Sequence, residues 1–345
     1  MPKTNYLLLI VFCVNACTIP THDFASNESD ITGIKLDIGC LIGKPSIELI
    51  FLDSLLLFYD PYENKSVTVY DTKNKQLVRR FLSEGQGPGE VVMRPLSLFT
   101  SPVEKRICMY QTQISKLNIY EPIDIIENDH IADPTQLQFS GKMKPMSLKK
   151  IKHGYVGIGA FEDGRFRMYD SGGNIVSAFG KYPFRGEEMD FMGRFFIYQG
   201  FVATSIDGEC FAIGSSYCDN LEFYQIVDGT AVLKKKYESY DVMAEFVGNV
   251  IRRNDDCIMN YKAAFGGKYC YMLYSGETYL EKGKNTAGGK RIIVFDWNGN
   301  YLKSYKAEVE IIAFCVDEEN NMIYAIIRDK FDEDGGGFCI AQFNI

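Results

Sequence analysis

The segment Ser66–Asp71, SVTVYD, carries the pattern that decides the fold: alternating apolar residues, an aromatic residue, and then an acid or amide. The pattern returns in KLNIYE ending at Glu121, RFRMYD ending at Asp170, NLEFYQ ending at Gln225 and RIIVFD ending at Asp296. The aromatic residues of these segments lie 50, 49, 55 and 71 positions apart, and a weaker copy, CIAQFNI, follows after another 48. Alternation with a period of two predicts β-strand, so the chain is predicted to repeat one strand-rich unit.

Each unit has room for four strands. In the first unit they are expected at residues 47–51, 55–59, 66–70 and 76–81, with turn-forming residues between them. The last unit offers three strands, and the N-terminal segment Ile31–Ile38 is expected to supply the fourth. This closure removes open sheet edges, which invite aggregation. The sequence therefore predicts an all-β fold over residues 31–345: a six-bladed β-propeller of four-stranded antiparallel blades, its ring closed by an N-terminal strand.

The longest spacing, 71 residues, indicates insertions within the fifth unit rather than another blade. We expect Asp241–Arg253 to form a short helix between blades and Gly276–Lys290 to form a long polar loop. Insertions on a rigid scaffold are often binding elements. A simple solvated loop is an equally good interpretation.

The N-terminus predicts export. Lys3 precedes an apolar run of eight residues, Leu7–Val14, which is far shorter than the ~20 residues that span a bilayer. The run ends in VNAC, where a small residue precedes Cys17, whose thiol can accept a diacylglycerol group. We expect a lipoprotein signal peptide over residues 1–16, lipid attachment at Cys17 and a polar tether over residues 17–30. The alternative is an ordinary secretory signal with a chance cysteine.

Charge and cysteine content limit the partners and the chemistry. The net charge is −8, and an acidic surface disfavours nonspecific binding to nucleic acid or anionic headgroups. Eight of the ten cysteines lie beyond Cys17, and none forms a C-x-x-C pair of the kind that binds zinc. Most of them lie in strand-like apolar segments, so we expect mainly buried thiols, with a few disulfides as the alternative.

The string GQGPGE, Gly85–Glu90, completes a resemblance. Together with the lipoprotein signal and six units of about fifty residues, it resembles the six-bladed, TolB-like β-propeller lipoproteins of Bacteroidetes. Val91 follows the string where the family usually has an aromatic residue such as Phe. The resemblance covers the mature chain and implies an exported propeller anchored in the envelope, with no catalytic residues to transfer.

The same glycine-rich string admits two interpretations. A phosphate site needs a helix after the glycines, but Val91, Val92 and Pro95 oppose a helix, and Glu90 would repel a phosphate. We therefore interpret the string as the crossing between two blades near the mouth of the central channel. A similar crossing, Phe179–Glu188, also ends in a glutamate, and an arginine follows each glutamate. These residues either pin adjacent blades together or line a polar pocket. The candidate binding residues are Gly85, Gln86, Gly87, Gly89, Glu90, Arg94, Arg185, Glu188 and Arg194.

Enzymatic motifs are weak. The three histidines, His22, His130 and His153, cannot make a histidine-rich metal site, and no G-x-S-x-G elbow is present. DEDGGG, Asp332–Gly337, lacks the alternating ligands of a calcium loop and is better explained as an acidic turn. We expect no catalytic residue, metal or cofactor.

The sequence thus predicts a non-catalytic binding or protein-interaction module. We expect it in the bacterial cell envelope, as an outer-membrane lipoprotein on either the periplasmic or the surface face. Its partners are expected to be the membrane, through the lipid, and an envelope protein or exported peptide. The second hypothesis is a metal-dependent hydrolase or lyase that acts at the axial channel of the propeller. The sequence does not identify the ligand.

Overall fold

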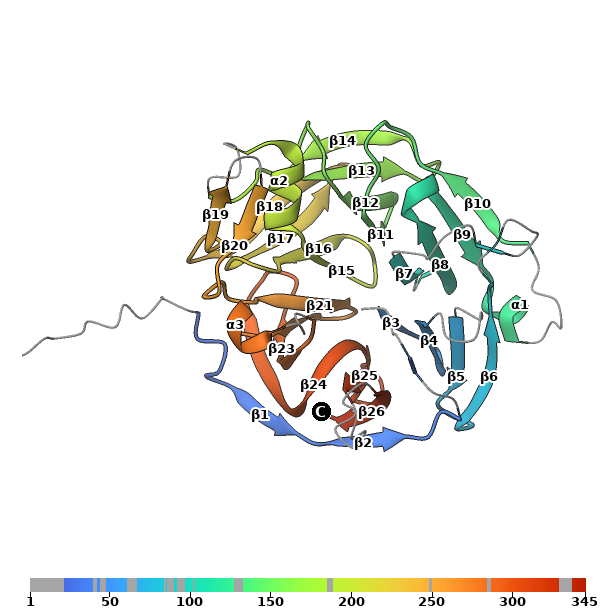
Figure 1. Ribbon diagram of the computed structural model, residues 1–345. Coiled ribbons are helices and arrows are strands. Elements are labelled where there is room, and N and C mark those ends of the chain that lie inside the picture. Colours follow the sequence, from blue (N-terminus) through green and yellow to red (C-terminus); the bar gives the residue numbers. More distant parts are fainter. Residues whose placement is uncertain are drawn as a thin grey trace, which may run out of the picture.

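The described strands of the computed structural model form six blades around a central axis (Figure 1). The structure describes residues 22–39, 42–43, 48–60, 67–83, 85, 90–91, 97–101, 103–126, 133–184, 189–247, 250–283, 287–328 and 337–345. The aromatic residue of each sequence repeat lies on the third strand of its sheet or, for the last copy, on β26 (Phe338–Asn344), and all are buried. The predicted propeller of antiparallel blades is confirmed.

Blades 1 to 4 are separate four-stranded antiparallel sheets, each built from consecutive strands. Blade 1 contains β3 (Leu49–Leu52), β4 (Leu55–Tyr59), β5 (Val67–Asp71) and β6 (Gln76–Phe81). Blade 2 contains β7 (Ser97–Ser101), β8 (Arg106–Gln111), β9 (Lys116–Tyr120) and β10 (Thr135–Gln138). Blade 3 contains β11 (Ser147–Ile151), β12 (Gly154–Ile158), β13 (Phe166–Asp170) and β14 (Ile175–Phe179). Blade 4 contains β15 (Gly200–Thr204), β16 (Cys210–Ser215), β17 (Asn220–Val227) and β18 (Thr230–Glu238).

Blades 5 and 6 share one long strand, β24 (Tyr301–Asp317). Its first part pairs with β23 (Gly289–Phe295), which continues through β22 (Cys270–Tyr274) to β21 (Tyr261–Gly266) in blade 5. Its last part, from Ile311, pairs with β25 (Met322–Arg328), and β25 pairs with β26 in blade 6. The same strand is therefore the outer strand of one blade and the inner strand of the next.

The N-terminal segment closes the ring, as predicted. β2 (Gly33–Leu36) pairs antiparallel with β26 and completes blade 6. The segment does more than the sequence predicted, because β1 (Glu28–Ile31) pairs in parallel with β24 and covers the outer edge of blade 5. Residues 22–30, which the sequence analysis assigned to a polar tether, pack against the propeller, and Phe24 joins a buried aromatic cluster with Phe295.

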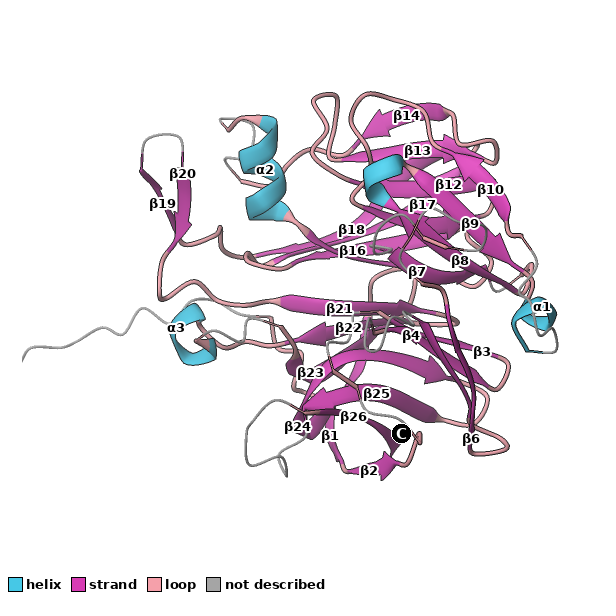
Figure 2. Cartoon of the chain, turned by 45° about the vertical axis from the view of Figure 1, so that its right-hand side comes forward, coloured by secondary structure: helices cyan, strands magenta, loops and turns pink. Residues whose placement is uncertain are grey.

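Three insertions gather on the face where the inner strands begin, which we call the insertion face (Figure 2). They are α2 (Phe191–Tyr198), the hairpin of β19 (Ala244–Val247) and β20 (Val250–Arg253), and α3 (Tyr279–Lys282). Asp190 caps α2 by accepting a hydrogen bond from the Gly193 amide, and Thr278 and Glu281 form a capping box on α3. The remaining helical segments, 3₁₀ helix Thr112–Ile114 and α1 (Pro122–Ile126), belong to blade 2.

The predicted helix over residues 241–253 is wrong, because this stretch contains the β19–β20 hairpin. The sequence explains the outcome, since β-branched and aromatic residues flank Gly248–Asn249, a dipeptide typical of hairpin turns.

The insertions are packed rather than loose. A cluster of buried side chains joins α2, the segments that flank the hairpin and the turn before β17: Tyr182, Met189, Ile197, Tyr198, Cys218, Val242 and Cys257.

The blades are held together mainly by apolar and aromatic packing between neighbouring sheets. A polar joint between blades 3 and 4 adds to it. Arg165, only 1% exposed, pairs with Glu222 at 3.2 Å and donates hydrogen bonds to Asn220 and Ser215. Seven cysteines beyond Cys17 are described, six of them buried, and six are free thiols: Cys108, Cys210, Cys218, Cys257, Cys270 and Cys315. No described helix has the length and apolar character to cross a membrane.

Candidate functional site

A cavity of about 290 Å³ lies between blades 4 and 5, beneath the N-terminal segment. Its walls come from the turn before β17, the segment after β18, the strands β21 to β23, and the chain around Phe24. The residues that line it are His22, Phe24, Asp219, Tyr240, Tyr261, Tyr274, Ser275, Gly276, Arg291 and Ile293. The cavity is therefore walled by aromatic rings and contains a small number of polar groups, as ligand sites commonly are.

Two buried polar atoms in this cavity have no hydrogen-bond partner. They are the Tyr261 hydroxyl, on a side chain that is fully buried, and Oδ2 of Asp219, whose residue is 5% exposed. His22 Nε2 lies 3.3 Å from Oδ2, within ion-pair range, but its hydrogen-bond contact is with Ser239 Oγ at 3.0 Å. Buried polar groups are nearly always paired, so two orphans that line one cavity indicate a place for a ligand or water.

The environment disfavours the charged forms of these groups. Burial raises the pKa of Asp219, and the nearby carboxylate of Glu238 raises it further, while Ser239 and His22 act in the opposite direction. Burial likewise raises the pKa of Tyr261 well above its ordinary value. The Asp219 carboxylate is thus held in a low-dielectric site without a full counter-charge.

A hydrogen-bonded group forms the opposite wall of the cavity. Tyr240 donates from its hydroxyl to Asn260 Oδ1 at 2.7 Å. The rings of Tyr261 and Tyr274 meet edge to face, with centroids 5.8 Å apart. Because Tyr261 and Tyr274 lie opposite each other on paired strands, the register of β21 and β22 fixes both rings.

The N-terminal segment forms part of the cavity and is fixed by contacts on both sides. Ser304 donates a hydrogen bond to the Phe24 carbonyl at 2.7 Å. Glu28, on β1, pairs with Arg291, which lines the cavity. The Phe24 ring packs against Tyr237 and Phe295. The strand that closes the ring therefore also completes the cavity.

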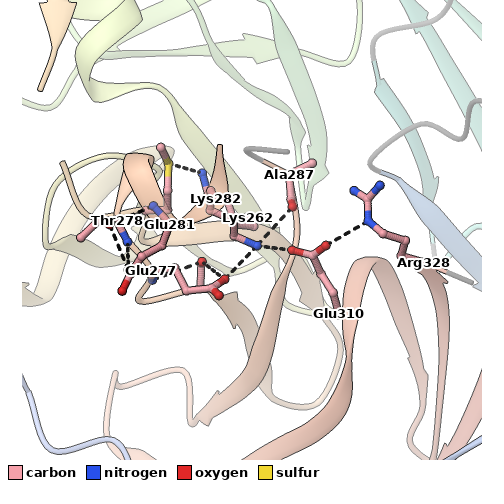
Figure 3. Close-up of polar contacts among 10 residues, drawn as sticks. Lys262, Glu277, Thr278, Glu281, Lys282, Ala287, Glu310 and Arg328 are labelled. Atoms are coloured by element: carbon pink, nitrogen blue, oxygen red, sulfur yellow. Dashed lines mark hydrogen bonds and ion pairs between the residues drawn. The ribbon is translucent and has the colours of Figure 1, made fainter. Parts of the chain in front are cut away.

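A second polar cluster lies at the insertion face and joins blades 5 and 6 (Figure 3). Lys282 of α3 pairs with Glu277 at 3.0 Å and with Glu310, which also pairs with Arg328 at 3.2 Å. Nearby, Lys262 is buried and contacts Met259 Sδ at 3.1 Å. Burial, with Lys282 and Arg253 close by, lowers the pKa of Lys262 to about 7. The charges of the first group balance, which indicates a structural joint.

The axial channel contains a smaller cavity of about 80 Å³. Phenylalanines from five inner strands line it: Phe51, Phe99, Phe201, Phe265 and Phe314. The third blade contributes Lys149 instead, which pairs with Glu48 at 2.9 Å and lies 5.7 Å from the Phe99 ring centroid. Glu48 also accepts a hydrogen bond from the Leu98 amide. Among the described lining residues, the one carboxylate is thus already neutralised.

Comparison with known proteins agrees with the propeller fold. The model of the family described as TolB-like 6-blade propeller-like matches residues 44–319. The chain belongs to the TolB-like six-bladed propeller family. This TolB-like propeller resembles the structure of a protein from Bacteroides fragilis named as exported (TM-score 0.56, 15% identity, 91% of this chain and 94% of that one). It also resembles a DUF4221 family member from Bacteroides vulgatus (TM-score 0.53, 11% identity, 92% and 96%). A third similar structure is the calcium-binding protein regucalcin from Agrobacterium tumefaciens (TM-score 0.50, 11% identity, 91% and 95%). At these identities the structural likenesses show the fold alone. No curated protein matches the chain.

The candidate residues in the GQGPGE string occupy the crossing from β6 to β7. Of these, Gly85 and Glu90 are described, whereas Gln86, Gly87 and Gly89, like Arg94 four residues after the string, lie outside the described residues. The Gly85 amide donates to the Val91 carbonyl at 2.9 Å, and the Val91 amide donates to the Ser83 carbonyl at 3.0 Å. A Cβ on Gly85 would lie 1.9 Å from the Glu90 carboxylate, the end of a side chain that can move. Val91 is fully buried between blades 1 and 2, so the crossing is anchored in the core.

The remaining candidates are less informative. Arg194 lies on α2, where its Nε donates to the Met189 carbonyl at 2.8 Å and its guanidinium lies 5.5 Å from the Tyr182 ring centroid. Cys17, Arg185 and Glu188 lie outside the described residues. Neither Gly85, Glu90 nor Arg194 lines the channel cavity or the cavity between blades 4 and 5. Their role in binding stays a prediction.

No sequence pattern points to the larger cavity of this TolB-like propeller. Asp219, Tyr261 and His22 come from three distant segments, and none belongs to a motif. His22 was assigned to the tether. A partial signal was present in the high tyrosine content of 22 residues, since tyrosines combine ring surface with a polar group.

Proposed function

We propose that this TolB-like propeller is an exported, lipid-anchored binding module of the bacterial cell envelope that does not transform its ligand. The observation that carries the proposal is the 290 Å³ cavity between blades 4 and 5, with two buried polar atoms that have no hydrogen-bond partner. An unpaired buried polar group costs roughly 1–3 kcal/mol, so a ligand that pairs with both would recover this free energy on binding.

Three features support the envelope assignment. They are the short apolar run before Cys17, the family, and the fold shared with an exported Bacteroides protein. The assignment as an outer-membrane lipoprotein rests on the sequence alone, which leaves the periplasmic and the surface face equally open. An envelope protein or exported peptide is the macromolecular partner that we favour, with the cavity as the place where a side chain or a small molecule enters.

The metal-dependent hydrolase or lyase receives less support from the residues at the axis. Of the described residues that line the channel cavity, Glu48 alone carries a carboxylate, and it is engaged by Lys149 and the Leu98 amide. Hard cations prefer several oxygen ligands at one site. We therefore place the binding site between blades 4 and 5 rather than at the axis.

Crosslinking in the native membrane tests this function. The acylated protein would be crosslinked in intact cells, recovered, and analysed both for covalently joined proteins and, by native mass spectrometry, for bound small molecules. We expect an adduct or partner that is lost in the double variant Asp219→Asn, Tyr261→Phe. The matched control Asp317→Asn changes a buried aspartate outside the cavity and should retain it. Identical captures from all three proteins, or none, would refute the proposal.

A further inference from the structure

We propose that the cavity between blades 4 and 5 binds the ammonium group of a small organic cation. This inference rests on the proposed function and specifies the class of ligand. It follows from the charge of the cavity, the nature of its walls and the atoms that lack partners.

The charge balance favours a cation. Arg291 lines the cavity and carries a permanent positive charge. Its guanidinium forms two contacts with the carboxylate of Glu28, which neutralises it. That pair is neutral overall, which leaves the carboxylate of Asp219. The other charged neighbours of Asp219 are His22, a partial counter-charge when protonated, and Glu238, which adds negative charge. Glu238 is itself paired with Lys236 at 2.6 Å. The negative charge of Asp219 is thus balanced only in part, by His22 when that ring is protonated.

The walls favour an organic cation over a metal ion. Four aromatic side chains line the cavity together with Asp219: Phe24, Tyr240, Tyr261 and Tyr274. The faces of such rings attract ammonium groups, and the attraction is stronger where water is excluded. A metal ion would need several oxygen ligands, whereas within the described residues no group of three or more His, Cys, Asp or Glu side chains is placed to hold one.

The orphaned atoms indicate how the ligand is oriented. Oδ2 of Asp219 is an acceptor, so it fits an N–H of the ammonium or, for a quaternary group, its positive methyl shell. The Tyr261 hydroxyl both donates and accepts, and fits a hydroxyl or ether oxygen near the cation. The ligand that satisfies both is an amino alcohol or a similar small amine.

Matched pairs of probes test the charge requirement directly. Choline and its neutral carbon analogue 3,3-dimethyl-1-butanol have nearly the same shape, and ethanolamine can be compared with ethylene glycol. Each is titrated by calorimetry into the mature chain carrying Cys17→Ser, which avoids detergent. We expect each cation to bind at least about tenfold more tightly than its neutral partner, a difference of about 1.4 kcal/mol.

Variants connect the result to the cavity. Asp219→Asn should abolish the preference for the cation, Tyr261→Phe should weaken binding of the two hydroxylated amines, and Asp317→Asn should change neither. Equal affinity for charged and neutral probes overturns the assignment, as does the absence of binding at millimolar concentrations. Either result concerns only the ligand class, because the proposed function is tested separately by capture from the native membrane.

Lipid vesicles distinguish an ammonium group on a lipid headgroup from one on a soluble amine. If the same Cys17→Ser chain is retained by phosphatidylethanolamine vesicles but not by phosphatidylglycerol vesicles, and Asp219→Asn removes retention, the ammonium belongs to a lipid headgroup. Binding of the free amines without retention on either vesicle identifies a soluble amine. Retention on both vesicles that is unchanged in Asp219→Asn contradicts a role for the cavity in lipid recognition.

Discussion

The carboxylate of Asp219 illustrates how one residue serves a ligand at the expense of stability. Its pKa is raised by burial, and a carboxyl with a raised pKa stabilises the fold below its ordinary value near 3.8 and loses that contribution as the pH rises through the folded value. At pH 7 the ionised form therefore destabilises the empty protein. Such residues are candidates for function because selection for stability alone would remove them.

We expect Asp219→Asn to raise the melting temperature at pH 7. A gain of about 1 kcal/mol would correspond to about 2–4 °C in a large domain, and it should shrink as the pH approaches 4. Thermal unfolding followed by circular dichroism at both pH values measures it. Asp317→Asn is the control and should not stabilise, because Asp317 accepts hydrogen bonds from the amide and side chain of Asn320. A lower melting temperature for Asp219→Asn at pH 7 would contradict the account.

The lowered pKa of Lys262 leads to an independent prediction about how the stability of the fold depends on pH. Its pKa is lowered to about 7, first by burial and then by Lys282 and Arg253, so above pH 7 the unfolded chain binds this proton more strongly than the folded chain. Stability must then rise with pH between about 7 and 9, with a slope of up to about 1.4 kcal/mol per pH unit.

Lys262→Met keeps the apolar stem and removes the titrating group. We expect the variant to be more stable than the parent at pH 7 and to lose the rise between pH 7 and 9, as measured by urea unfolding at each pH. Lys268→Met, on the exposed turn before β22, is the control and should retain the slope. A slope unchanged by Lys262→Met would show that another group is responsible.

At the scale of elements, Gly85 in the crossing that contains GQGPGE and Gly266 on β21 differ in what a larger side chain would meet. A Cβ on Gly85 would meet the end of the Glu90 side chain, which can move, whereas a Cβ on Gly266 in blade 5 would lie 2.0 Å from the Thr204 carbonyl oxygen in blade 4. We expect Gly85→Ala to cost less than about 1 kcal/mol and Gly266→Ala to cost several times more. Urea unfolding of both variants, and of Gly85→Ala combined with Glu90→Ala, tests this. A Gly85→Ala cost that Glu90→Ala does not reduce would contradict the steric role.

The N-terminal strands provide a second test at this scale. β1 and β2 cover the edges of β24 and β26, and Ile31 is 6% exposed. Removing residues 1–36 should expose these edges, cost several kcal/mol and produce oligomers, because burying one such side chain alone contributes about 1.5–3 kcal/mol. A chain beginning at His22 keeps both strands and should match the mature protein. Unfolding and size-exclusion chromatography compare the two, and an equally stable monomer from the shorter chain would refute the closure.

Elements were predictable where one local signal dominated. Alternating residues located the strands of blade 1 to within two positions, and the missing strand of the last unit predicted the role of β2. The parallel pairing of β1 with β24 had no comparable signal, because ESDI is polar at three of its four positions. The hairpin over β19 and β20 was predicted as a helix, although Gly248–Asn249 carried the correct signal.

At the scale of the molecule, the cavity could not be predicted because it exists only when the ring is closed. Asp219 and Tyr240 flank two strands of blade 4, Tyr261 and Tyr274 lie on two strands of blade 5, and His22 arrives from the N-terminus. A repeat pattern gives the strands within each blade, but it does not specify which side chains meet between blades. The buried carboxylate of Asp219, with an oxygen that lacks a hydrogen-bond partner, becomes visible only in that assembled environment.

The predicted lipid at Cys17 would bring this cavity close to the membrane. His22 lies five positions after Cys17, and five extended residues span at most about 17–18 Å, so the anchor would hold His22 near the headgroup layer. We expect Cys17→Ser to abolish incorporation of labelled palmitate and to move the protein from the membrane fraction to the soluble fraction, with its melting temperature unchanged. A flexible insertion of about 20 residues after Cys17 should retain the label but place the cavity farther from the bilayer. If partner capture falls in this variant, the short distance matters for binding. An unlabelled protein in the parent strain, or membrane retention of Cys17→Ser, would contradict anchoring through this cysteine.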